Sequence, residues 1–99
     1  MSKVYILNDA GHDYSAAVEF GELTFLNIPY GVMQDIPQAY TYLKEGLQDS
    51  EDGDYLLIGG PASMNCVATA ILVEWHQRIN LLIFKGDHYE GTTVVTTNS

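Results

Sequence analysis

The stretch 55–84 constrains the fold of this chain more than any other part of its sequence. Four apolar residues, 55–58, precede a turn of two glycines and a proline, 59–61, and a second apolar run follows at 81–84. Short, continuous apolar runs are typical of strands buried on both faces, as in parallel sheets. The segment between the runs is apolar nearly all round, which predicts a largely buried helix from about 61 to 77 and a right-handed crossover.

The rest of the chain repeats this alternation of strand and helix patterns. Further strands are expected over 4–7, 23–28 and 89–95, and further helices over 16–20 and from Asp35, as N-cap, to about Leu47. We therefore predict a single small α/β domain over residues 1–99, a three-layer and Rossmann-like fold with a flexible tail at 95–99. Its sheet is expected to be mostly parallel, of strand order 2-1-3-4, with 89–95 as an antiparallel C-terminal edge strand.

The charge balance is strongly acidic. Thirteen Asp and Glu against four Lys and Arg give a formal net charge of −9. Nonspecific affinity for DNA, RNA or anionic membranes comes from Lys and Arg, so this balance disfavours such partners. The acidic stretch 49–54 is expected to be disordered or solvated.

The cellular compartment is predicted from what the sequence contains. A single cysteine, Cys66, allows no disulfide within the chain, which favours a reducing compartment. The first residues show no leader pattern, and no apolar run approaches the ~20 residues of a membrane span. We therefore expect a cytoplasmic protein.

Two polar, glycine-bearing loops, 8–15 and 59–65, follow the first and third expected strands. In the order 2-1-3-4 the connections diverge between these strands, and ligands of open α/β sheets bind at the carboxyl ends of strands at such a switch point. The sequence therefore predicts a pocket between the two loops. Its expected residues are Asn8, Asp9, Gly11, His12, Asp13, Tyr14, Gly59, Gly60, Ser63, Met64 and Asn65.

The glycine turn carries the expected binding chemistry. A helix N-terminus presents backbone N–H groups and a partial positive charge, which suit an anion or a polar head group. We expect the N–H groups of Ser63 to Asn65 to hold a small polar or nucleotide-like ligand together with the 8–15 loop. The turn lacks the Lys of a P-loop and the third glycine of a dinucleotide motif. A plain, tight strand-to-helix connection explains the same residues without a ligand.

Candidate catalytic groups lie in the same two segments. His12 with Asp9 or Asp13 resembles an acid–base pair, and Ser63 or Cys66 is a candidate nucleophile. Each also has a structural explanation, because Asp13 can cap a helix and Cys66 can be an unreactive thiol packed in one. No metal site and no cofactor are expected, since further ligands would have to come from elsewhere in the chain.

The chain resembles a family of short uncharacterised phage and prophage proteins. The resemblance rests on Gly11-His12-Asp13-Tyr14-Ser15, Phe20-Gly21-Glu22-Leu23, Asp54-Tyr55-Leu56-Leu57 and Asn80-Leu81-Leu82-Ile83-Phe84. It implies an accessory role in the cytoplasm of an infected bacterium, and it assigns no catalytic residue. The expected fold is also similar to small Rossmann-like domains that sense cyclic oligonucleotides in bacterial immunity, which suggests counter-defence.

The leading functional hypothesis is a non-enzymatic binding module for a small polar or nucleotide-like ligand. A homodimer is expected, because the core is small and aromatic residues are many. The alternative is an acidic interaction protein that binds and inhibits a host protein. A third hypothesis is a small hydrolase or nuclease that uses His12.

Overall fold

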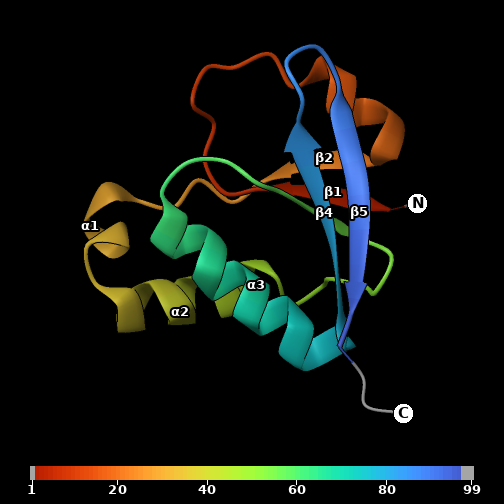
Figure 1. Cartoon of the computed structure of the whole chain (residues 1–99). Helices are drawn as coiled ribbons and strands as arrows, with labels where there is room; N and C mark the ends of the chain where they lie inside the picture. Colours follow the sequence, from red (N-terminus) through yellow and green to blue (C-terminus); the bar gives the residue numbers. More distant parts are fainter. Residues whose placement is uncertain (1, 97–99) are drawn as a thin grey trace.

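The computed structural model describes residues 2–96, which form an α/β structure around one five-stranded sheet (Figure 1). The elements in chain order are β1 (Lys3–Ile6), the 3-10 helix η1 (Ser15–Phe20), β2 (Glu22–Phe25), α1 (Tyr30–Met33), α2 (Ile36–Gly46), β3 (Tyr55–Leu57), α3 (Ala62–His76), β4 (Arg78–Phe84) and β5 (Tyr89–Val95). None of the helices within 2–96 is long and apolar enough to span a membrane.

The predicted strand order is confirmed. The sheet has the order β2-β1-β3-β4-β5, and its first four strands are parallel. The hairpin of β4 and β5 is antiparallel and pairs seven residues of each strand, from Arg78 opposite Val95 to Phe84 opposite Tyr89. Of the tail expected over 95–99, Val95 ends β5, and residues 97–99 lie outside the described residues.

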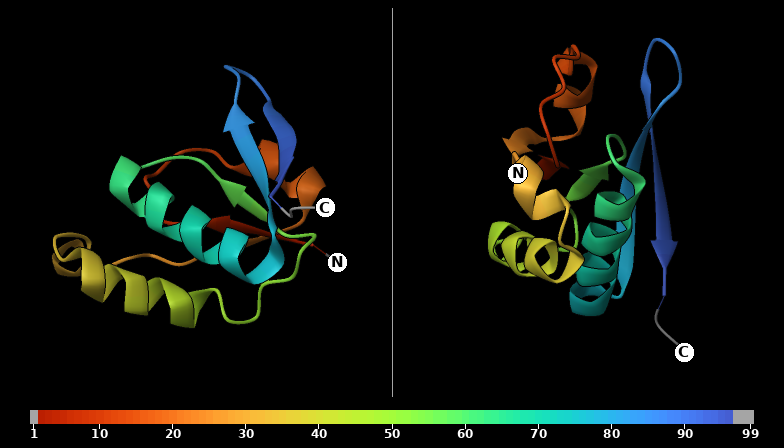
Figure 2. Two further views of the ribbon diagram at one scale, coloured as in Figure 1. Left: turned by 60° about the horizontal axis from the view of Figure 1, so that its bottom comes forward. Right: turned by 90° about the vertical axis from the view of Figure 1, so that its left-hand side faces the viewer.

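The helices lie on both faces of the sheet, as a doubly wound chain requires. The connection from β1 to β2 runs in the opposite direction to those from β2 to β3 and from β3 to β4, so helices of equal crossover hand must lie on opposite faces. Accordingly, α2 and α3 pack side by side on one face and η1 lies on the other (Figure 2). Successive residues of β1 alternate between the two cores, with Tyr5 on the α2–α3 side and Ile6 on the η1 side.

Local sequence signals explain where α2 and α3 begin and end. Asp35 caps α2, because its carboxylate accepts a hydrogen bond from the Gln38 N–H at 3.3 Å. Helix α3 ends at His76 and is capped by Gln77. The backbone of Gln77 is left-handed (φ 53°), and its N–H donates to the Val73 carbonyl at 2.8 Å. This sharp ending lets β4 begin at the next residue.

The bounds of several expected elements differ from those observed. The second strand ends at Phe25 rather than at 28, because Asn27 takes a positive φ of 49° and turns the chain. The Ile28 N–H still donates to the Leu7 carbonyl, so the segment stays beside β1. The segment 16–20 is part of a 3-10 helix with Tyr14 at its N-cap position, and the first strand covers Lys3–Ile6 rather than 4–7.

The prediction that α3 is largely buried was wrong. Met64, Ala68, Ile71 and Leu72 are buried, whereas Cys66 and Ala70 are exposed and Trp75 keeps 38% of its surface accessible. The sheet covers one stripe of the helix, and within residues 2–96 no element covers the opposite stripe. Cys66 is therefore not the packed thiol that its apolar neighbours suggested.

Replacing Gly21 by alanine should destabilise the fold by about 1–3 kcal/mol, the usual cost of overpacking. A Cβ at Gly21 would lie 2.3 Å from the backbone oxygen of Ser2, which accepts the Glu22 N–H beside the sheet edge. Gly31→Ala is the matched control, because no atom lies within 4 Å of its added Cβ. Urea denaturation of both variants tests the clash, and equal stabilities would contradict it.

Candidate functional site

A cavity of about 590 Å³ opens at the carboxyl ends of β1 and β3. Loop 8–14, the glycine turn and the β4–β5 hairpin meet there, and Figure 1 shows the loop and the hairpin tip at the same end of the sheet. The lining residues are Ile6, Leu7, Asn8, Ala10, His12, Asp13, Tyr14, Met33, Leu57, Ile58, Gly59, Gly60, Pro61, Phe84 and Tyr89. The cavity thus lies between the first and third strands, at the switch point of the sheet.

The structure brings part of the predicted residue set to this cavity. Asn8, His12, Asp13, Tyr14, Gly59 and Gly60 line it. Asp9, Gly11, Ser63, Met64 and Asn65 are not among its lining residues. The two predicted loops therefore do converge, but on the helix side the cavity is lined by the turn rather than by the first residues of α3.

Asn65 has a structural task at the glycine turn. Its side-chain oxygen accepts from the Gly59 N–H at 3.3 Å, and its amide nitrogen donates to the carbonyls of Gly59 (2.9 Å) and Pro61 (2.8 Å). The backbone N–H groups of Met64 and Asn65 donate to the Pro61 carbonyl, and the Met64 side chain is fully buried in the core. These donors hold the turn in shape and are engaged within the protein.

Tyr14 organises the other loop. Its hydroxyl donates to the Asn8 carbonyl at 3.4 Å and accepts from the Ala10 N–H at 3.3 Å, which closes the loop around the phenol. Its ring also makes edge-to-face contacts with Phe25 and His12, at centroid distances of 5.7 and 6.2 Å. A nearly buried tyrosine thus fixes the polar loop against the sheet.

Asn8 anchors the start of this loop and leaves one polar atom unused. Its side-chain nitrogen donates to the Ile28 carbonyl at 2.9 Å. Its side-chain oxygen is buried without a hydrogen-bond partner, alone among the side-chain polar atoms of the described residues. Buried acceptors are normally paired, so this oxygen is an exception inside the protein rather than a group on the open wall of the cavity.

The carboxylates beside His12 are occupied by the backbone. Asp13 accepts from the Ser15 N–H at 2.9 Å, and this hydrogen bond lowers the pKa of its carboxyl group. Asp9 accepts from the Gly11 N–H at 3.0 Å. Within residues 2–96, no hydrogen bond joins His12 to either carboxylate, and no group of three or more His, Cys, Asp or Glu is placed to hold a metal ion.

The hairpin supplies an aromatic wall that the sequence interpretation missed. Phe84 ends β4 and Tyr89 begins β5, and their rings lie 5.2 Å apart between centroids. Tyr89 is buried, and burial, followed by the nearby Tyr14 and Asp13, raises the pKa of its hydroxyl. A usable signal was present, because residues that flank a tight antiparallel turn must lie opposite each other at the end of the sheet.

The cavity is mostly apolar. Aliphatic and aromatic side chains form its floor and walls, and polar side chains come from Asn8, His12, Asp13 and the two tyrosines. No Lys or Arg lines it, and Lys3 and Arg78 lie at the opposite edge of the sheet, where they begin β1 and β4. A highly charged anion would lose its hydration in this cavity without gaining a positively charged partner.

Comparison with protein families identifies the origin of the chain. A family model described as Phage Pam3 gp32-like protein matches residues 2–96. The chain belongs to this family. The resemblance to short phage proteins is therefore confirmed, and the molecule is a phage protein of accessory type. No curated protein and no solved structure matches it, so the likeness to Rossmann-like nucleotide-sensing domains stays a prediction.

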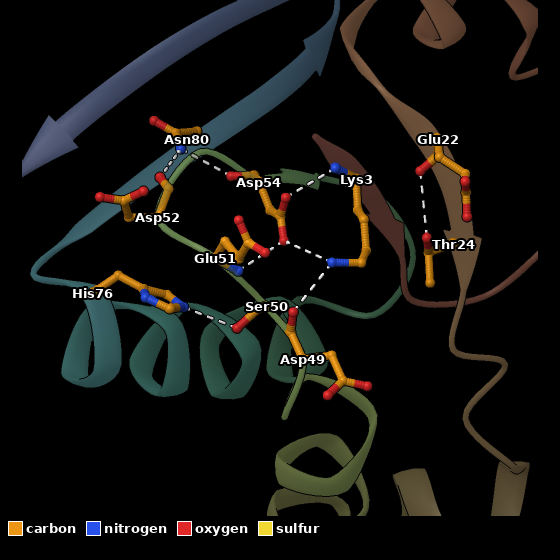
Figure 3. A network of polar contacts seen from close by, with 10 residues as sticks. All are labelled: Lys3, Glu22, Thr24, Asp49, Ser50, Glu51, Asp52, Asp54, His76 and Asn80. Carbon is orange, nitrogen blue, oxygen red and sulfur yellow. Dashed lines mark hydrogen bonds and ion pairs between the residues drawn. The ribbon is translucent and has the colours of Figure 1, made fainter. Parts of the chain in front are cut away.

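A second polar cluster of this gp32-like protein closes the opposite edge of the sheet (Figure 3). Asp54 accepts from the Lys3 N–H at 2.9 Å and from the Glu51 N–H at 2.8 Å, and the Lys3 ammonium lies 3.6 Å from its carboxylate. Asn80 donates to the carbonyls of Asp52 (2.7 Å) and Asp54 (2.9 Å). The acidic stretch 49–54 is thus hydrogen-bonded to β1 and β4, and the expectation of disorder there was wrong.

The stability of the protein should fall at alkaline pH, because Tyr5 is buried close to this acidic cluster. Burial, followed by the charges of Asp54, Asp49 and Glu51, raises the pKa of Tyr5 to about 12. An unfolded tyrosine titrates near 10, so the contribution of Tyr5 is complete below pH ~10 and is lost as the pH rises to ~12. Urea denaturation at several alkaline pH values should show a smaller loss of stability for Tyr5→Phe than for the wild type.

Tyr30→Phe is the control for this measurement. The Tyr30 side chain is 76% exposed, so its removal should leave the alkaline stability profile unchanged. If Tyr5→Phe and Tyr30→Phe give the same profile, the raised pKa of Tyr5 does not contribute to folding.

Proposed function

We propose that this phage accessory protein is a non-enzymatic binding module, and that its ligand is a small molecule bound in the cavity at the carboxyl edge of the sheet. The observation that carries the proposal is the convergence of loop 8–14, the glycine turn and the β4–β5 hairpin on one cavity at the switch point. Its volume of about 590 Å³ falls within the ~300–1,000 Å³ of small-molecule sites.

The chemistry of the walls favours a flat ligand with an apolar body and a polar edge. Leu57, Met33 and the Phe84–Tyr89 pair offer apolar surface, and His12 and Asp13 offer hydrogen-bonding groups. A nucleobase has this combination of properties. The phosphate of a nucleotide would meet no Lys or Arg among the lining residues, so the nucleotide-like ligands that we favour bind through the base.

Binding without turnover fits the arrangement better than hydrolysis. A general base needs a hydrogen-bonded partner that orients it, and the carboxylates of Asp9 and Asp13 accept from backbone N–H groups instead of from His12. The candidate nucleophiles Ser63 and Cys66 are not among the residues that line the cavity. The hydrolase hypothesis would require turnover that is lost in His12→Ala.

The setting of this function is also part of the proposal. We infer action in the host bacterial cytoplasm, supported by the phage family and by the single, exposed Cys66. Sequestration of a host signalling molecule by the cavity would serve counter-defence.

Filling the cavity should abolish ligand-induced stabilisation. In a thermal-shift screen of nucleobases, nucleosides and cyclic oligonucleotides, a ligand at 100 times its Kd should stabilise the wild type by ~2.7 kcal/mol. Ala10→Phe places a ring in the cavity and should remove this shift. Ala16→Phe is the matched control, because Ala16 is also exposed but does not line the cavity. Equal shifts in both variants, or no shift with any compound, would refute the proposal.

The acidic surface favours a second candidate function, inhibition of a basic host protein. The net charge is −9, and one of the four cationic side chains, Lys3, is paired with Asp54. A surface of this kind speeds association with a cationic partner and loses that effect as salt rises. A purified complex whose association rate does not change between low and high ionic strength would count against this function.

A further inference from the structure

We infer that the ligand of this cavity is an organic cation: a positively charged group attached to a flat, apolar body. The inference deepens the proposed function and rests on it. It narrows that function, because among flat ligands with an apolar body and a polar edge it selects cationic ones over neutral bases and anionic nucleotides.

The charged groups around the cavity are mostly acidic. Asp13 lines it, and its carboxylate is ionised at neutral pH, as aspartates ordinarily are. Asp9 lies in the same loop, and Asp87 and Glu90 lie in the adjoining hairpin. Lys85 is the one Lys or Arg in these two segments, and it is not a lining residue. A cation entering the cavity therefore meets attraction and little repulsion.

The aromatic walls provide the second line of evidence. Tyr14, Phe84 and Tyr89 line the same cavity, and a cation within ~6 Å of an aromatic face is attracted by the ring. The protein already contains one such contact, since the Lys44 ammonium lies 5.1 Å from the centroid of the Tyr40 ring. Aromatic rings and a carboxylate that line the same cavity offer an organic cation both a ring surface and an opposite charge.

Charge and aromatic surface act at the same place. The negative charge of Asp13 is one of the causes that raise the pKa of Tyr89, after burial and the influence of Tyr14. Asp13 and Tyr89 therefore lie close enough to interact electrostatically, and both line the cavity. The net charge of −9 adds a long-range attraction for cations, which a concave apolar cavity concentrates.

The test uses three bicyclic probes that differ in charge: N-methylquinolinium, neutral quinoline and anionic quinoline-2-carboxylate. Calorimetry is run at pH 8, where a histidine is generally uncharged. This matters because His12 lines the cavity and His88 lies in the hairpin beside it. The cation should bind about tenfold more tightly than quinoline, as expected for a desolvated cation–aromatic contact. The anion should bind most weakly.

Asp13→Asn separates charge from structure. Asparagine keeps the oxygen that accepts the Ser15 N–H but removes the charge, so affinity for the cation should fall several-fold while quinoline binds as before. Glu45→Gln removes the same charge from an exposed position of α2 and should leave both affinities unchanged.

The outcomes separate a failure of this charge assignment from a failure of the proposed binding function. If quinoline binds as tightly as N-methylquinolinium, and Ala10→Phe blocks both, the cavity binds ligands but the charge assignment is wrong. If Asp13→Asn weakens both probes equally, the carboxylate supports the loop and the inference also fails. If no probe binds, or Ala10→Phe leaves binding intact, the proposed cavity itself is refuted.

Discussion

The connections between strands change direction across the sheet at β1 and β3, and the rest of this molecule depends on that change. One connection leaves β1 toward β2 and the later ones run the other way, so η1 must cover one face while α2 and α3 cover the other. No helix passes over the gap between β1 and β3 at their carboxyl ends. The cavity follows from this topology, because the loops that leave these two strands lead to helices on opposite faces of the sheet and both line the space between the strand ends.

The two ends of the sheet use polar groups in opposite ways. At the amino edge, Asp54 and Asn80 are saturated with hydrogen bonds from within the protein, and they tie an acidic loop to the strands. At the carboxyl edge, Tyr14 and Asn65 shape the loops, whereas Asn8 retains an unpaired oxygen beside an apolar hollow. The internally satisfied edge ties the strands together, whereas the other edge is hollowed by the cavity.

The sequence allowed much of the fold to be predicted, because apolar runs and caps are local signals. The unit 55–84, the strand order and the Asp35 cap were all recognisable from residue patterns. The exposed stripe of α3 was not, since apolar composition does not reveal how many faces of a helix the rest of the fold can cover. The ordered acidic loop was missed for a related reason: its bonds to Lys3 and Asn80 join residues distant in sequence.

The hairpin that provides the aromatic wall has a particular place in the sheet. Strand β5 is an edge strand whose single neighbour is β4, whereas β1 and β3 are each held between two strands. Changes near Phe84 and Tyr89 thus disturb one strand pairing and leave the parallel centre of the sheet intact. Substitutions in this peripheral ribbon can therefore reshape the aromatic side of the cavity while the strands that hold the fold together keep their pairing.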